Sequence, residues 1–155
     1  MPRHVDFQKP VVIAGIATRT TNAREMDPGT AALSGLWGRF YAEEAATSAE
    51  SPDNRPLYSV YTEYESDFNG AYTVVIGREG ADKSKAQKVV TIAAGPYLEF
   101  ISSGAMPGAV IDGWKQVWSY FADTKAHSRR AYTTDFEYYD PAEPSTVRIY
   151  IAVSR

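Results

Sequence analysis

Two stretches of similar length dominate the distribution of apolar positions along this chain. Apolar and aromatic residues recur every three or four positions over 33–41 and again over 110–121. This spacing places them on one face of a helix. Thr30 precedes the first stretch as a suitable N-cap, and Pro107 suits the first turn of the second. The pattern therefore predicts two helices, each with one face against a core.

Short apolar or alternating runs on either side of these helices predict strands. Gly, Pro, Asn and Asp residues bound the runs, as is typical of strand ends. Asn69-Gly70 favours a two-residue hairpin turn between two of them. The polar segment 47–56 is predicted to be a loop, and 80–88 a linker. We expect strands over 11–17, 57–66, 71–77, 88–92, 97–101, 130–139 and 146–154.

The predicted elements follow the same order, strand, helix, strand, strand, in both halves of the chain. The helical stripe of the first half has a counterpart at constant spacing in the second: Leu33, Leu36, Trp37 and Phe40 against Trp114, Val117, Trp118 and Phe121. After each stripe comes a strand with a glutamate near aromatics, Glu63 on one face with Tyr61 in the first half and Glu137 in the second. These correspondences predict an internal duplication.

We therefore expect one α+β domain over 1–155, built as a tandem pseudo-two-fold repeat of strand-helix-strand-strand units. The units span about 4–79 and 88–155, and together form a curved antiparallel sheet of six to eight strands with two main helices on one face. Such a sheet is roughly 29–38 Å wide, whereas two adjacent helices cover about 20–24 Å. An uncovered strip between the helices would be filled by large side chains, a partner chain or a ligand.

Composition removes several functional classes. The chain has no cysteine, which excludes disulfides, thiolate metal sites and cysteine nucleophiles. Only His4 and His127 could supply imidazole ligands, so we expect no metal and no other cofactor. The net charge is −3 and the 16 basic residues are dispersed, which argues against direct nucleic-acid binding. No apolar run resembles a signal peptide or a membrane span, so we expect a cytoplasmic protein without membrane contact.

The strongest candidate chemistry lies in the predicted strand 130–139. Because alternate strand residues face opposite sides, Asp135, Glu137 and Tyr139 share one face. A carboxylate flanked by aromatic rings suits an organic cation, since partial burial strengthens charge attraction and ring faces add cation–π contact. The same alternation also fits a sheet face that is open to water. The residues alone leave both interpretations open.

The three tryptophans extend this hypothesis to the helices. Trp37 lies on the first helical stripe, and Trp114 and Trp118 on the second. Core packing is the ordinary role of a tryptophan on such a stripe. However, three indole N–H groups need hydrogen-bond acceptors, which a groove between the helices supplies more easily than a dry core.

Six segments of the chain together form a recognisable pattern. They are Leu36-Trp37-Gly38-Arg39-Phe40, Tyr58-Ser59-Val60-Tyr61, Ile92-Ala93-Ala94-Gly95-Pro96-Tyr97, Gly113-Trp114-Lys115-Gln116-Val117-Trp118, Asp135-Phe136-Glu137-Tyr138-Tyr139 and Ile149-Tyr150-Ile151-Ala152-Val153. This pattern resembles the gyrase-inhibitor-like (GyrI-like) family, the effector-binding domains of AraC-type and multidrug-responsive bacterial regulators. The resemblance covers almost the whole chain, and some stand-alone members of similar layout are carried on integron gene cassettes.

The resemblance implies a ligand groove where the two halves meet. In that groove a glutamate, here Glu137, would neutralise a lipophilic aromatic cation. Aromatic walls would come from Tyr139 and, less directly matched, from Trp37, Tyr61, Trp114 and Trp118. The first predicted strand begins about ten residues into the chain, so we expect no DNA-binding helix-turn-helix before it.

Three functions follow from this reading. The first is a binding module for lipophilic cationic aromatic small molecules, acting in sensing or sequestration. The second is a protein-interaction module, with a gyrase-like partner or a second copy in a homodimer. The third is a hydrolase of electrophilic small molecules, in which Glu137 activates water and a tyrosine donates a proton.

Overall fold

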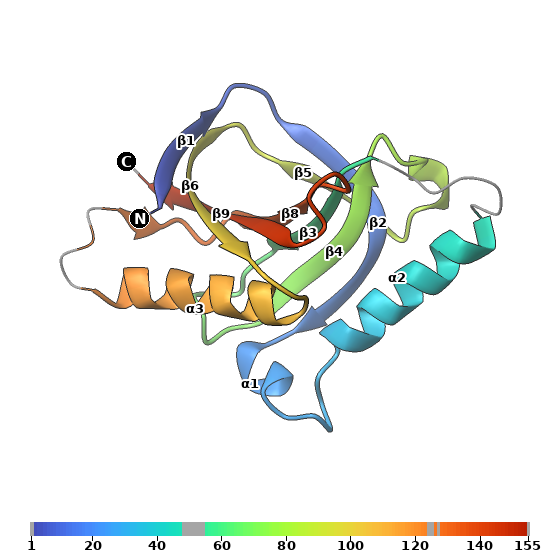
Figure 1. Ribbon diagram of the computed structural model, residues 1–155, viewed down its shortest axis with the longest axis horizontal. Helices are drawn as coiled ribbons and strands as arrows, with labels where there is room; N and C mark the ends of the chain where they lie inside the picture. The colour runs from blue at the N-terminus through green and yellow to red at the C-terminus, as the bar shows by residue number, and fades with distance from the viewer. Residues whose placement is uncertain (1, 48–54, 124–125, 127, 155) are drawn as a thin grey trace.

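The computed structural model describes residues 2–47, 55–123, 126 and 128–154. His127 and most of the predicted loop 47–56 lie outside these residues. Within them the fold is α+β, with one nine-stranded antiparallel sheet and three α-helices (Figure 1). The helices are α1 (Asn22–Glu25), α2 (Leu33–Thr47) and α3 (Gly108–Ala122). The strands are β1 (Arg3–Phe7), β2 (Val11–Thr20), β3 (Leu57–Thr62), β4 (Tyr72–Glu79), β5 (Lys88–Ile92), β6 (Gly95–Ser103), β7 (Arg129–Arg130), β8 (Thr134–Tyr139) and β9 (Thr146–Ser154), and a 3-10 turn, η1 (Lys83–Lys85), precedes β5.

The sheet curls strongly, as Figure 1 shows. Its strand order is β1-β6-β9-β8-β3-β4-β2-β5, and β7 pairs with β9. Apolar side chains from both end strands, including Val5 of β1 and Ile92 of β5, join one core cluster with Val60 and Phe136 of the central strands. This cluster fills the inside of the curl. β3 and β8 are paired at the centre of the sheet, with Val60 opposite Phe136.

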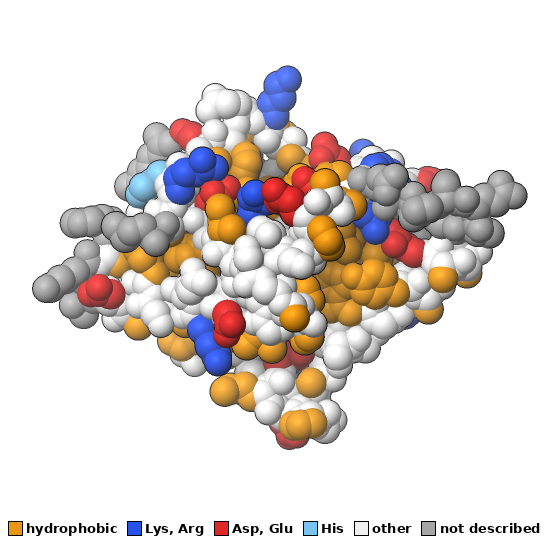
Figure 2. Space-filling view, viewed as in Figure 1, with side chains coloured by type: hydrophobic (Ala, Val, Ile, Leu, Met, Phe, Trp, Pro, Cys, Tyr) orange, Lys and Arg blue, Asp and Glu red, His pale blue; other side chains and the backbone are white. Residues whose placement is uncertain are grey.

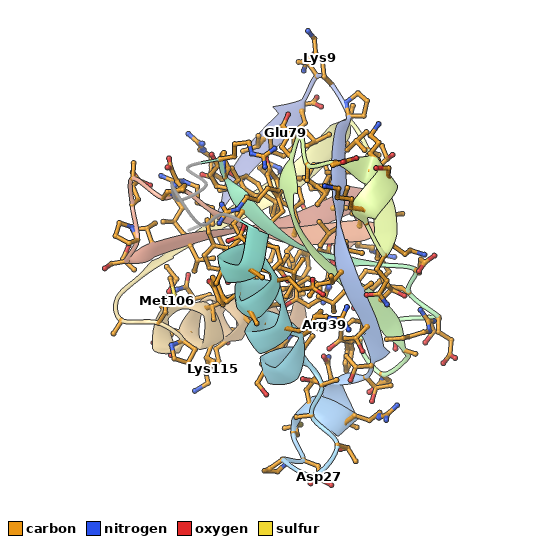
Figure 3. All side chains as sticks on the ribbon, turned by 90° about the vertical axis from the view of Figure 1, so that its right-hand side faces the viewer. Lys9, Asp27, Arg39, Glu79, Met106 and Lys115 are labelled. Carbon is orange, nitrogen blue, oxygen red and sulfur yellow. The ribbon has the colours of Figure 1, made fainter. Side chains whose placement is uncertain are left out.

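The two long helices cover the other face, α2 over one half of the sheet and α3 over the other (Figure 1). Leu36 of α2 packs on β2, β3 and β4, and Val117 of α3 packs on β6 and β9. Trp114 and Tyr139 contact both of these clusters. The connection between α1 and α2 projects beyond the helices, with Asp27 at its tip and Lys9 at the opposite end of the molecule (Figure 3). Among the described residues, no helix combines the length and apolar character needed to cross a membrane.

The sheet has nine strands, more than the six to eight that the sequence predicts, partly because β1 is not among the predicted strands. β1 pairs with β6 at one edge of the sheet. Its residues alternate, with exposed Arg3, His4 and Asp6 between the partly buried Val5 and Phe7. This alternation is the sequence signal for an edge strand. The predicted strand 130–139 is also divided, into β7 and β8, at a positive φ of 52° on Tyr132.

Two local predictions were wrong. The β3–β4 hairpin closes through residues 63–71 rather than through a two-residue Asn69-Gly70 turn, and the Glu65 N–H donates to the Ala71 carbonyl at 2.8 Å. Thr30 does not cap α2, since its hydroxyl donates to the Arg24 carbonyl at 2.8 Å. Glu25 takes the capping role, accepting from the backbone N–H groups of Ala32 and Leu33 at 2.9 and 3.0 Å. The pseudo-two-fold repeat stays a prediction.

A close backbone approach between β2 and β4 requires glycine. Gly15 lies opposite Gly77 in the ladder, and a Cβ on Gly15 would lie 1.8 Å from the Ile76 carbonyl oxygen. We expect Gly15→Ala to lower the free energy of unfolding by about 1–3 kcal/mol, the range for an overpacked interior. Gly35→Ala is the matched control, because a Cβ there meets nothing within 4 Å on helix α2. It should raise stability by up to about 1 kcal/mol. Urea unfolding of both variants measures this, and equal effects would contradict it.

Candidate functional site

A cavity of about 520 Å³ lies between α2 and α3, above the central strands. This volume is within the usual range for small-molecule pockets. All six residues that the sequence analysis proposes for ligand binding line it: Trp37, Tyr61, Trp114, Trp118, Glu137 and Tyr139. On the face shown in Figure 2, hydrophobic side chains gather alongside α2 and around the α1 segment below it.

Glu137 is almost completely buried at this cavity, with 3% of its surface exposed. Three neutral groups donate hydrogen bonds to its carboxylate. The Tyr61 hydroxyl and the Trp114 indole Nε1 donate to Oε2 at 2.6 and 2.7 Å, and the Tyr139 hydroxyl donates to Oε1 at 2.6 Å. No Lys, Arg or His within the described part of the chain forms an ion pair with it. The carboxylate is therefore hydrogen-bonded but not neutralised.

The pattern of pKa shifts follows from this geometry. Burial raises the pKa of Glu137 above its ordinary value of 4.5, and the bonds from Tyr139, Tyr61 and Trp114 oppose this rise without cancelling it. Burial and the nearby Glu137 charge also raise the pKa values of Tyr61 and Tyr139. Both phenols consequently stay protonated at physiological pH and remain hydrogen-bond donors.

Asp135 provides an internal comparison on the same strand. It is fully buried, like Glu137, and its Oδ1 accepts from the Ala152 N–H at 2.9 Å. Its Oδ2 accepts from the Tyr64 hydroxyl at 2.5 Å and from Arg130 Nη2 at 2.7 Å. Arg130 is itself 7% exposed, so this is a buried ion pair. The described residues therefore supply a cation for Asp135 but none for Glu137.

Aromatic rings form the walls of the cavity in edge-to-face and tilted contacts. Tyr61 meets Trp114 with ring centroids 5.1 Å apart, and Trp37 meets Tyr139 at 5.6 Å. Trp118, 6.3 Å from Trp114, is 47% exposed, which places it at the mouth. Other exposed apolar residues at the mouth are Met26, Phe68 and Ile111. The wall is buried near Glu137 and open to solvent further out.

Glu63 does not share the surroundings of Glu137. β3 ends at Thr62, and Glu63 has a positive φ of 51°. Its side chain is 49% exposed and pairs with Lys88 Nζ at 2.9 Å. The predicted shared face with Tyr61 is therefore wrong, because the strand ends before Glu63. Glu63 is exposed to solvent beyond the end of the strand, whereas the alternative of a solvated sheet face is wrong for the buried Glu137.

The sequence analysis missed other lining residues, among them two tyrosines, a glutamate and an arginine. Tyr64 and Tyr72 belong to the β3–β4 hairpin, Glu25 to α1, and Arg130 to β7. The surplus of tyrosines, 11 in the chain, was a signal for the first two. The other two depend on α1 and on the break between β7 and β8, which no periodic pattern marks.

The fold and this cavity define a ligand-binding α+β domain, and comparison with known proteins gives its family. The chain belongs to the Cass2 family of integron-associated effector binding proteins, whose model matches residues 8–153. This confirms the GyrI-like, effector-binding resemblance.

Individual relatives match along nearly their whole length. The integron cassette protein VCH_CASS2 of Vibrio cholerae is 39% identical, with a TM-score of 0.86 over 99% of this chain and 95% of that one. YobU of Bacillus subtilis (strain 168), named as a candidate transcriptional regulator, is 28% identical over 98% of this chain and 96% of its own. SAV2435, solved with tetraphenylphosphonium bound, is 21% identical, with a TM-score of 0.75 over 99% and 94% of the two chains, and so shares the fold.

The raised pKa of Glu137 predicts the direction in which the free energy of unfolding changes with pH. A carboxyl group with a raised folded-state pKa favours folding most at low pH, and this contribution is lost as the pH rises through that pKa. Glu137→Gln removes the dependence. The free energy of unfolding of the variant, relative to wild type, should therefore increase as the pH rises from about 4.5.

Glu63→Gln is the control, because its stability difference from wild type should change with pH in the opposite direction. Lys88 and Thr73 lower the pKa of Glu63, so its contribution is present at higher pH and is lost as the pH falls. Relative to wild type, this variant should lose stability as the pH rises. Urea unfolding at a series of pH values measures both differences. A Glu137→Gln difference that stays flat or falls with pH would contradict the assignment.

Proposed function

We propose that this protein binds lipophilic cationic aromatic small molecules between α2 and α3, in sensing or sequestration. One observation carries the proposal: Glu137 is a buried carboxylate that has three neutral donors and no cationic partner among the described residues. A ligand cation would supply the charge that the chain itself supplies to Asp135.

The energetics favour an organic cation over a hydrated metal ion or a neutral molecule. A buried charge is costly unless it is paired, so a cation that reaches Glu137 relieves an existing cost. The rings of Tyr61, Trp114 and Tyr139 lie around the carboxylate. Each ring face in contact with the ligand cation would add about 0.5–2 kcal/mol. The exposed apolar residues at the mouth would cover the lipophilic part of the ligand.

The comparisons support this proposal in two ways. The family is described as effector binding, which fits a pocket for a small molecule. The relative SAV2435 was solved with tetraphenylphosphonium, a lipophilic aromatic cation, in a chain of the same fold. We infer that the six predicted residues, Trp37, Tyr61, Trp114, Trp118, Glu137 and Tyr139, contact the ligand here.

The test is a calorimetric titration of wild type and Glu137→Gln with an aryl trimethylammonium ion and with its neutral tert-butyl isostere. Glu137→Gln preserves the shape and removes the charge. Affinity for the cation should fall by about 1.5–3 kcal/mol, as expected for a charge-assisted contact. Affinity for the neutral isostere should be about equal in the two proteins.

Glu63→Gln controls for the general negative field of the protein, because Glu63 is exposed and lies outside the cavity lining. It should change the affinity for the cation by less than about 1 kcal/mol. If Glu63→Gln were the damaging change, or if both variants bound the cation like wild type, Glu137 would not be the counter-charge.

A further inference from the structure

A second carboxylate in the same cavity also lacks a cationic partner. Glu25, from α1, lines the cavity together with Glu137. Its three hydrogen bonds come from neutral donors: the Thr20 hydroxyl at 2.6 Å and the backbone N–H groups of Ala32 and Leu33. Within the described residues no Lys, Arg or His forms an ion pair with it. Its position is fixed, and its charge is not neutralised.

The basic residue of the described lining does not compensate for either glutamate. Arg130 is 2.7 Å from Asp135 and forms its buried ion pair. The Arg130 and Asp135 charges therefore cancel. Glu25 and Glu137 leave the cavity with a formal charge of −2, twice what a singly charged ligand would neutralise.

An aromatic wall separates the two carboxylates. Tyr61 donates to Glu137, and its ring lies 5.8 Å from that of Tyr72. Tyr72 in turn donates to Asn22 of α1 at 2.9 Å, in the helix that carries Glu25. Burial, then the charges of Glu25 and Glu137, raise the pKa of Tyr72.

We propose that the preferred ligands of this cavity are aromatic dications, whose two charges pair with Glu137 and Glu25 while their rings lie along Tyr61 and Tyr72. This inference rests on the proposed function and makes it more specific. The fixed position of Glu25 favours ligands with an aromatic spacer over flexible polyamines, because a rigid spacer loses less conformational entropy on binding.

The experiment uses two pairs of amidine compounds. Each pair consists of a dication with two amidinium groups and a monocation of the same skeleton, in which a nitrile replaces one amidinium. One pair is built on 1,4-benzene and one on 4,4′-stilbene, so that two charge separations are sampled. Titration of wild type should show at least one dication binding about tenfold more tightly than its monocationic partner. The affinity of that dication should also fall more steeply with added salt.

Glu25→Gln then identifies the second charge. Ala32 and Leu33 donate to different carboxylate oxygens of Glu25, so the glutamine carbonyl can still accept from one of them and the cap of α2 is retained in part. Asp27→Asn is the matched control, since Asp27 belongs to the same connection but lies outside the lining, at the tip seen in Figure 3. Glu25→Gln should weaken the dication about fivefold and leave the monocation within about twofold, whereas Asp27→Asn should change neither by more than about twofold.

The outcomes separate this inference from the proposed function. If both dications bound wild type no better than their monocations, the dication inference would be overturned, and this result does not depend on how any variant folds. It would equally be overturned if Glu25→Gln weakened monocation and dication alike, because Glu25 would then act only through the structure of α2. If no amidine bound wild type, or if Glu137→Gln changed none of the affinities, the proposed function itself would fail.

Discussion

The hydrogen-bonded burial of the Glu137 carboxylate is the interaction on which the site depends. Removing a carboxylate from water without a cation costs several kcal/mol, and the cost is tolerable only when hydrogen bonds satisfy its oxygens. The three donors come from different parts of the chain: Tyr61 from β3, Trp114 from α3 and Tyr139 from β8 itself. The pairing of β3 with β8 and the docking of α3 on the sheet are both needed to assemble them.

Asp135 and Glu137 show two ways of accommodating a buried carboxylate on one strand. Asp135 is neutralised by Arg130, which lines the cavity, in a buried ion pair. Tyr61 and Tyr139, which donate to Glu137, have raised pKa values and therefore remain neutral. The negative charge of the site persists as a result. A pocket built around an incomplete ion pair selects for positive charge, and its aromatic walls select for flat or ring-bearing ligands.

Periodicity was sufficient to predict the parts of the site that lie in regular elements. The period of two over 134–139 placed Asp135, Glu137 and Tyr139 on one face, and the helical stripes placed Trp37, Trp114 and Trp118 on the helix sides that line the cavity. The contributions of α1 and the β3–β4 loop could not be predicted in this way. α1 spans Asn22–Glu25, too short for a periodic signal, and tertiary bonds from Thr20 and Tyr72 hold it. Glu63 and Glu137 looked equivalent in the sequence because the end of β3 at Thr62 could not be located there. Strand ends depend on backbone geometry rather than on residue type.

The central claim is that Glu137 is an ionisable carboxylate without a cationic partner among the described residues, and that a ligand cation forms an ion pair with it. Its most direct test is the titration of the Glu137 side-chain carboxyl carbon by ¹³C NMR, in the free protein and in the presence of saturating tetraphenylphosphonium. The account predicts a pKa above the ordinary value of 4.5 in the free protein and a clearly lower pKa with the cation bound. A pKa at or below the ordinary value in the free protein, or one that saturating cation leaves unchanged, would contradict it.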